Sequence, residues 1–127
     1  MRLALDTNAY RALAKSDPKA LDLVQRAEVI GMPVPVLGEL RSGFLGGTKA
    51  LQNEAGLLKF LDFPRVRILA CDEQTTHFYG ELKLQLRRQG TPIPINDVWI
   101  AALAIQHRMT LFTYDRDFDR LPQLARA

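Results

Sequence analysis

Four acidic side chains stand at the edges of apolar segments in this chain of 127 residues. They are the acids of LALDTN, VLGELR, INDVWIAAL and LFTYDRDF, namely Asp6, Glu39, Asp97 and Asp115. A carboxylate drawn toward an apolar segment loses hydration and needs a compensating group. One divalent cation can compensate several carboxylates, provided that the fold brings them together. The pattern therefore predicts a metal-dependent phosphoryl-transfer site.

Carboxylate oxygens suit Mg²⁺ and also Mn²⁺, which are hard cations that keep part of their water shell. Such a cation lowers the pKa of a bound water and neutralises charge that builds on a phosphoryl oxygen. Without a cation, four clustered carboxylates would repel one another and raise their own pKa values. Each acid also has an ordinary structural interpretation, as a helix cap, a loop residue or an exposed helix position.

The elements that must position these acids alternate between strands and helices. Short apolar segments predict strands at residues 3–6, 29–36, 66–69 and 111–113. Helical spacing and capping residues predict helices at 7–14, 17–27, 36–44, 51–61, 72–90 and 96–105. Pro33 and Pro35 weaken the second strand, because proline has no N–H for a sheet ladder. The alternation is typical of an α/β fold with a central, mostly parallel sheet and helices on both faces.

In parallel sheets of this kind, sites form at the carboxyl ends of the strands. Asp6 and Asp115 lie where two predicted strands end. Glu39 and Asp97 lie in the first turn or so of helices that should begin on the same edge. All four acids are therefore expected on one rim, although they are far apart in the sequence.

Length and composition predict one domain over residues 1–127. The longest apolar run, Val98–Ile105, is far shorter than the roughly 20 residues that cross a bilayer. The segment MRLALDTN does not resemble a signal peptide. A lone cysteine, Cys71, excludes an internal disulfide and fits a reducing compartment. These features predict a cytoplasmic protein without membrane association.

The net charge of +3 comes from 17 basic and 14 acidic residues, and arginines outnumber lysines twelve to five. Arginine suits bidentate contact with phosphate, and a basic surface around an acidic pocket suits a polyanionic substrate. Genome composition explains an arginine-rich chain equally well. The arginines that are candidates for contact with the phosphates of such a substrate are Arg41, Arg87, Arg88 and Arg116.

Other chemistries lack the residues that they need. His77 and His107 have no cysteines at zinc-site spacing, and no GxSxG, Walker A or GxGxxG motif occurs. A receiver-like signalling module is an alternative of a different class, because it is also α/β and binds Mg²⁺ with acids at strand ends. Its last strand should end in a lysine, whereas this chain has Thr113-Tyr114-Asp115 there.

The segments LALDTN, PVPVLGELRSG, INDVWIAALAIQHR and LFTYDRDF, in this order and spacing, resemble those of the PIN-domain nucleases. More narrowly, the chain resembles the VapC-type toxins of type II toxin–antitoxin pairs over essentially its whole length. The resemblance implies an α/β/α sandwich with a sheet of four or five strands. It also implies endoribonuclease activity, the hydrolysis of RNA phosphodiester bonds with Mg²⁺ or Mn²⁺. The alternative with the same fold is a housekeeping nuclease of RNA maturation or a silent binder.

Carried over position by position, the resemblance assigns catalysis to Asp6, Glu39, Asp97 and Asp115, and metal binding to Asp6, Asp97 and Asp115. It implies supporting polar roles for Thr7, Asn8 and Thr113. Asp117 lies in the same closing motif, and some relatives carry their fourth acid there. The division of roles between Asp115 and Asp117 therefore stays open.

The resemblance further implies a homodimer, a cognate antitoxin that covers the pocket, and in some relatives a larger toxin–antitoxin assembly. Two apolar stripes, around Leu21–Ala27 and Leu51–Leu61, are candidates for lining the antitoxin groove, although packing in the core is the commoner use of such stripes. After Leu121 the chain has little room for another strand, so a fifth strand is in doubt.

Overall fold

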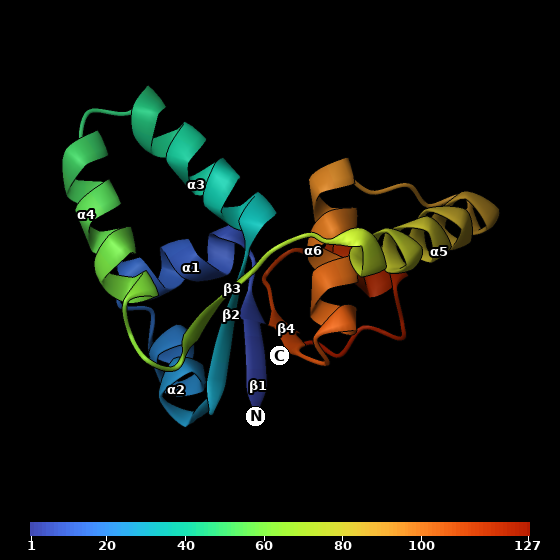
Figure 1. The fold of residues 1–127 in the computed structure, drawn as a ribbon, viewed down its shortest axis with the longest axis horizontal. Coiled ribbons are helices and arrows are strands. Elements are labelled where there is room, and N and C mark those ends of the chain that lie inside the picture. Colours follow the sequence, from blue (N-terminus) through green and yellow to red (C-terminus); the bar gives the residue numbers. More distant parts are fainter.

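The computed structural model describes residues 1–127, and strands alternate with helices along most of the chain (Figure 1). The strands are β1 (Arg2–Leu5), β2 (Val29–Pro33), β3 (Val66–Leu69) and β4 (Thr110–Phe112). The helices are α1 (Thr7–Ala14), α2 (Pro18–Arg26), α3 (Val34–Gly46), α4 (Ala50–Leu61), α5 (Glu73–Gln89) and α6 (Ile95–Gln106), followed by the 3₁₀ helix η1 (Arg116–Arg120).

The four strands form one parallel sheet in the order β3-β2-β1-β4. Leu3 pairs with Ile30 on one side and with Thr110 on the other, so β1 is an inner strand. Figure 1 shows α1, α2 and α4 on one side of the sheet and α5 and α6 on the other. The predicted three-layer α/β architecture is therefore confirmed.

The core is one cluster of 31 buried hydrophobic residues. β1 contributes Leu3, Ala4 and Leu5, all fully buried, as expected of a strand that is covered on both faces. α6 buries most of its surface, including every residue from Ile100 to Ala104, which its nearly uniform apolar sequence predicts. No helix is long and apolar enough to cross a membrane.

Aspartate side chains cap the N-termini of three helices, α1, α2 and α5, at the positions that the sequence predicts. Asp6, Asp17 and Asp72 each accept a hydrogen bond from the backbone N–H three residues further on. Gly90 ends α5 with φ of 69°, a left-handed conformation that favours glycine. These local signals explain why the boundaries of these three helices agree closely with those predicted from the sequence.

Two helices begin earlier than predicted, and in both cases a proline is involved. α3 begins at Val34 rather than near residue 36, because Pro35 lies in the first turn, where no N–H is needed. α6 begins at Ile95, with Pro94 as the residue before it and no side-chain cap. Asn96 is therefore not the cap of α6.

The C-terminal tail does not add a fifth strand. It makes a single parallel bridge, between Leu111 and Arg126. Two backbone hydrogen bonds hold it there: Leu111 donates to the carbonyl of Ala125 at 2.8 Å, and Ala127 donates to the carbonyl of Leu111 at 2.9 Å. The tail thus covers the outer edge of β4 without extending the sheet further.

Candidate active site

The four predicted acids meet at the carboxyl edge of the sheet. Asp6 follows β1, Asp115 follows β4, Glu39 lies in the second turn of α3 and Asp97 in the first turn of α6. They line one cavity of about 230 Å³, and its other lining residues are Thr7, Asn8, Arg11, Pro94 and Asn96. No apolar side chain other than proline lines it, so the cavity is suited to a charged or polar group.

Asp6 is the most deeply placed of these acids, with 5% of its surface exposed. Its Oδ1 accepts the N–H of Ala9 at 2.8 Å and its Oδ2 accepts the hydroxyl of Thr113. Burial raises the pKa of Asp6, the two hydrogen bonds lower it, and the charges of Asp115 and Glu39 raise it, with a net increase. The two hydrogen bonds fix the position of the carboxylate between α1 and β4.

A chain of hydrogen bonds continues from Thr113 into the segment after β4. The oxygen of its hydroxyl accepts the N–H of Asp115 at 2.9 Å, and Asp115 Oδ1 accepts the N–H of Asp117 at 2.9 Å. Thr113 therefore contacts both the carboxylate of Asp6 and the backbone of Asp115, and its supporting role stays a prediction.

Thr7 makes the corresponding contact for the acid on α3. Its hydroxyl donates to Glu39 Oε1 at 2.7 Å and so joins α1 to α3. Asn8 lines the cavity and is exposed, and its Oδ1 lies 3.5 Å from the Nη1 atom of Arg11 that donates to it. The two polar residues after Asp6 are thus both placed at the cavity.

The pKa of Asp97 rises from its ordinary value of 3.8 to about 7, which is the largest pKa shift among the site acids. Burial is the main cause, followed by the charges of Asp115, Glu39, Asp6 and Asp117. Each of these causes acts in the same direction and raises the pKa of Asp97. A set of hard oxygen donors that includes two carboxylates with raised pKa values, Asp6 and Asp97, fits a divalent cation such as Mg²⁺ or Mn²⁺.

The acids form two overlapping groups. Carboxylate oxygens of Asp97, Asp115 and Asp117 lie within 4.8 Å of one another and could share an ion. Asp117 does not line the cavity, however, and its carboxylate lies 3.5 Å from Arg120 Nη1. Asp97 and Asp115 belong to both groups, which makes them the centre of the candidate metal site, with Asp6 on one side and Asp117 on the other.

The predicted RNA-contacting arginines do not gather at the cavity. Arg41 pairs with Glu54, with Nε to Oε1 at 3.0 Å and Nη2 to Oε2 at 2.9 Å, and so ties α3 to α4. Arg88 is exposed at the end of α5, and Arg116 is exposed in the residue after Asp115. Arg116 is adjacent in sequence to Asp115, whereas Arg41, two positions after Glu39, is already paired with Glu54.

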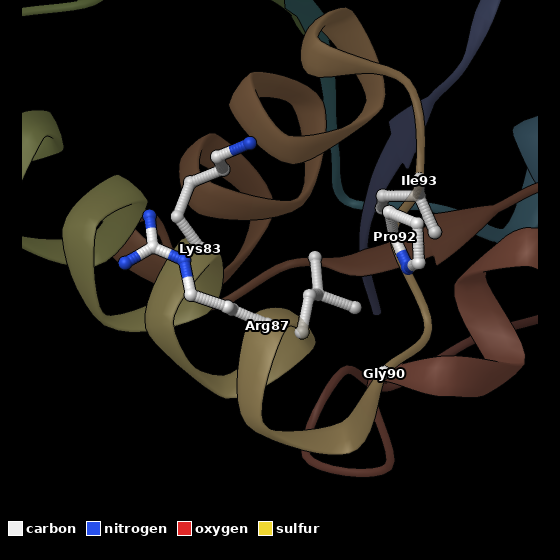
Figure 2. Close-up of a pocket in the computed structure, with 6 residues that line it drawn as sticks. Lys83, Arg87, Gly90, Pro92 and Ile93 are labelled. Atoms are coloured by element: carbon white, nitrogen blue, oxygen red, sulfur yellow. The ribbon is translucent and has the colours of Figure 1, made fainter.

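Arg87 lines a separate hollow of about 290 Å³. Figure 2 shows Lys83 and Arg87 on α5 at one side of this hollow and Pro92 and Ile93 on the other. None of the site acids lines it. The connection from α5 to α6 runs from this hollow to Pro94, which lines the acidic cavity.

Sequence reasoning missed Arg11, Pro94 and Asn96 as cavity residues. Arg11 follows Thr7 and Asn8 by four and three positions on α1, and residues at these spacings share a face of a helix. That spacing was the available signal for Arg11. Asn96 lies in the first turn of α6, directly before the site acid Asp97, and this adjacency was the available signal for Asn96.

The chain is similar to a known protein family over nearly its whole length. The family model described as PIN domain matches residues 3–124. The chain belongs to the PIN-domain family. The receiver-like alternative is therefore wrong.

Within that family, the chain groups with the VapC ribonucleases, the toxins of toxin–antitoxin systems. Ribonuclease VapC2 of Rickettsia felis is 34% identical over 125 residues, which cover 94% of this chain and 92% of the relative. Ribonuclease VapC1 of Haemophilus influenzae strain R2866 is 30% identical, with 94% and 92% covered.

Solved structures give the same relationship at the level of the fold. The structure of VapBC2 from Rickettsia felis bound to a DNA fragment from their promoter matches with a TM-score of 0.86 and 33% identity, over 100% of this chain and 98% of the other. VapBC-1 from nontypeable Haemophilus influenzae matches with a TM-score of 0.84 and 30% identity, over 100% and 97%.

Proposed function

We propose that this protein is a metal-dependent endoribonuclease, the toxin of a toxin–antitoxin pair, which hydrolyses RNA phosphodiester bonds in the acidic cavity. The observation that carries the proposal is the meeting of Asp6, Glu39, Asp97 and Asp115, from four separate segments, around one cavity. Membership of the VapC group supplies the reaction and the class of substrate.

The metal is Mg²⁺ in this proposal, with Mn²⁺ as a substitute, and Asp6, Asp97 and Asp115 hold it. When bound, the cation activates water and neutralises charge on the phosphodiester. Asp117 is close enough to Asp97 and Asp115 to join them as a ligand or to hold a water. Glu39 also lines the cavity, and the hydroxyl of Thr7 donates a hydrogen bond to its carboxylate. This carboxylate can accept a proton during the reaction.

Hydrogen bonds orient the acidic side chains of the cavity before the substrate binds. Thr113 and the N–H of Ala9 fix Asp6, and the N–H of Asp117 orients Asp115. Groups that orient ligand carboxylates in this way affect metal affinity and rate nearly as much as the ligands themselves. The protein therefore orients the carboxylates, and the proposed cation supplies the positive charge that neutralises them and the phosphodiester.

Single-stranded RNA fits the cavity better than a paired duplex. The cavity of about 230 Å³ has room for a phosphodiester and has no aromatic side chain in its lining on which a base could stack. A phosphate at the edge of a duplex cannot reach a recess of this kind unless the strand leaves the helix, and loops do so readily. Arg116, exposed beside Asp115, is placed to contact the neighbouring backbone.

An antitoxin is proposed to cover the apolar side chains of the hairpin formed by α3 and α4. Leu45, Leu51 and Leu58 are 80%, 90% and 53% exposed. In the predicted stripe at Leu51–Leu61, Leu51 and Leu58 are exposed and Leu61 is partly buried against the core, while the fully buried residue of α4 is Leu57. Exposed apolar patches of this kind are typical of protein-binding surfaces. Homodimer formation, a larger toxin–antitoxin assembly and a cytoplasmic location complete the proposal.

Cleavage of total RNA by the purified protein tests the nuclease proposal directly. Discrete fragments are expected with Mg²⁺ or Mn²⁺ and none with EDTA. Asp97→Asn should abolish cleavage, whereas Asp22→Asn, which removes an exposed acid on α2, should leave it unchanged. Cleavage that survives both EDTA and Asp97→Asn would refute the proposed site.

A further inference from the structure

Arg11 is the only basic residue among those that line the acidic cavity. We infer that Arg11 binds a backbone phosphate of the RNA at the mouth of this cavity, and that Gly43 leaves the space its guanidinium needs. The inference rests on the proposed function, because it concerns how the same substrate is held. It assigns a substrate-binding role to a residue outside the acidic motifs.

Arg11 lines three separate hollows on the protein surface. Besides the acidic cavity, it lines a hollow of about 420 Å³ along α1, together with Lys15 and Asp17. It also lines one of about 530 Å³ between α1 and the α3–α4 hairpin, together with Gly43 and Phe44. A strand whose scissile phosphate lies among the acids must leave the cavity across one of its edges, and Arg11 stands at the edge formed by α1.

The guanidinium of Arg11 is free to bind an anion. It forms no ion pair, and its one hydrogen bond is the 3.5 Å contact from Nη1 to Asn8 Oδ1. A guanidinium has five N–H donors, so most of its capacity is unused. Arg41 is the contrast, because its Nε and Nη2 both donate to the carboxylate of Glu54. Phosphate is the anion whose geometry suits a free arginine fork.

Gly43 supports the position of the guanidinium from the facing helix, α3. A Cβ built on Gly43 would lie 2.9 Å from Arg11 Nη2, and no other atom outside the local helix lies within 4 Å. The residue is in the interior of α3, where alanine is the better helix former. An alanine would therefore leave the fold intact and push the tip of Arg11 aside.

These contacts define a test with two independent variants. The substrate is a short labelled single-stranded RNA that spans a site cut in the total-RNA experiment. Arg11→Gln removes the charge, and Gly43→Ala keeps the charge but displaces it. Arg26→Gln is the matched control, because Arg26 ends α2 beyond the opposite end of the strands and pairs only with Asp22.

Arg11→Gln should lower kcat/KM about tenfold, mainly through KM, since a charged hydrogen bond to the substrate is lost. The slope of log kcat/KM against log salt concentration should become shallower by about 0.7, the value for one phosphate contact on a single strand. Gly43→Ala should shift kcat/KM in the same direction without lowering the melting temperature, and Arg11→Lys should lie between Arg11→Gln and the unsubstituted protein.

The contrary outcomes are separable. If the unsubstituted protein cuts no RNA, the proposed function fails and the inference fails with it. If it cuts RNA and Arg11→Gln has the KM and salt slope of Arg26→Gln, only the inference is refuted. If Arg11→Gln is impaired and Gly43→Ala is not, the role of Gly43 is refuted and that of Arg11 stands.

Discussion

The hydroxyl of Thr113 donates a hydrogen bond to Asp6 Oδ2 and so joins the ends of β4 and β1. The same oxygen accepts the N–H of Asp115. One side chain thus holds two of the four site acids in register, and neither acid can shift without breaking a bond to it.

Thr113→Val should reduce RNA cleavage by about 10–100-fold, the range for groups that orient metal ligands. Valine keeps the shape of threonine but cannot donate to Asp6 or accept from Asp115. Cleavage rates at saturating Mg²⁺ measure the effect, and Thr113→Ser, which keeps the hydroxyl, is the control. A Thr113→Val protein with the rate of the unsubstituted protein would show that the bond is unimportant.

Asp115→Asn and Asp117→Asn should have different consequences. Asp115 lines the cavity and belongs to both groups of acids, so its loss should abolish cleavage at any Mg²⁺ concentration. Asp117 lies outside the cavity and is near Arg120, so its loss should weaken Mg²⁺ affinity about tenfold and be overcome by added Mg²⁺. Magnesium titrations of the cleavage rate distinguish the two, and equal behaviour would contradict this division.

The metal-free protein should lose stability as the pH rises from about 4 to about 7. Asp97 has a pKa of about 7 in the folded protein, compared with an ordinary value of 3.8. Over this range the folded state holds a proton that the unfolded state has released, so stability falls with increasing pH. Thermal unfolding in EDTA at several pH values measures the trend.

Asp97→Asn is the control for that trend, because asparagine does not titrate. Its stability in EDTA should change less over the same pH range and should exceed that of the unsubstituted protein near pH 8. Added Mg²⁺ should stabilise the unsubstituted protein at this pH more than the variant. Parallel pH profiles for the two proteins would show that Asp97 does not carry the charge repulsion.

Leu57 and Leu58 are neighbours on α4 with opposite environments, since Leu57 is fully buried and Leu58 is 53% exposed. Leu57→Ala should cost about 2–5 kcal/mol of unfolding free energy, as core truncations do. Leu58→Ala should cost less than about 0.5 kcal/mol. It should nevertheless weaken binding of the cognate antitoxin, measured by co-purification. Full binding by Leu58→Ala would exclude this face from the interface.

The sequence predicts much of this site because its acids follow strong local signals. Asp6 and Asp115 follow short apolar strands, and parallel strands end on the same edge, so their meeting follows from topology. Capping also predicts the starts of α1, α2 and α5, because an aspartate side chain bonds to a nearby N–H.

What the sequence could not predict depends on contacts between distant segments. The pairing of Arg41 with Glu54 requires the angle of the α3–α4 hairpin, which helical spacing does not give. The outward orientation of Leu51 and Leu58 has the same origin, since periodicity finds an apolar stripe without saying what covers it. The free guanidinium of Arg11 likewise depends on a glycine on another helix.

The pairing of β1 with β4 also has a consequence for biosynthesis. Asp6 and its partner Thr113 are 107 positions apart, so almost the whole chain must leave the ribosome before the last strand can dock. Non-local pairing of this kind completes late in folding. A nascent chain in which β4 has not yet been made therefore carries no assembled acidic site, because the segments that hold Asp6 and Asp115 have not yet paired.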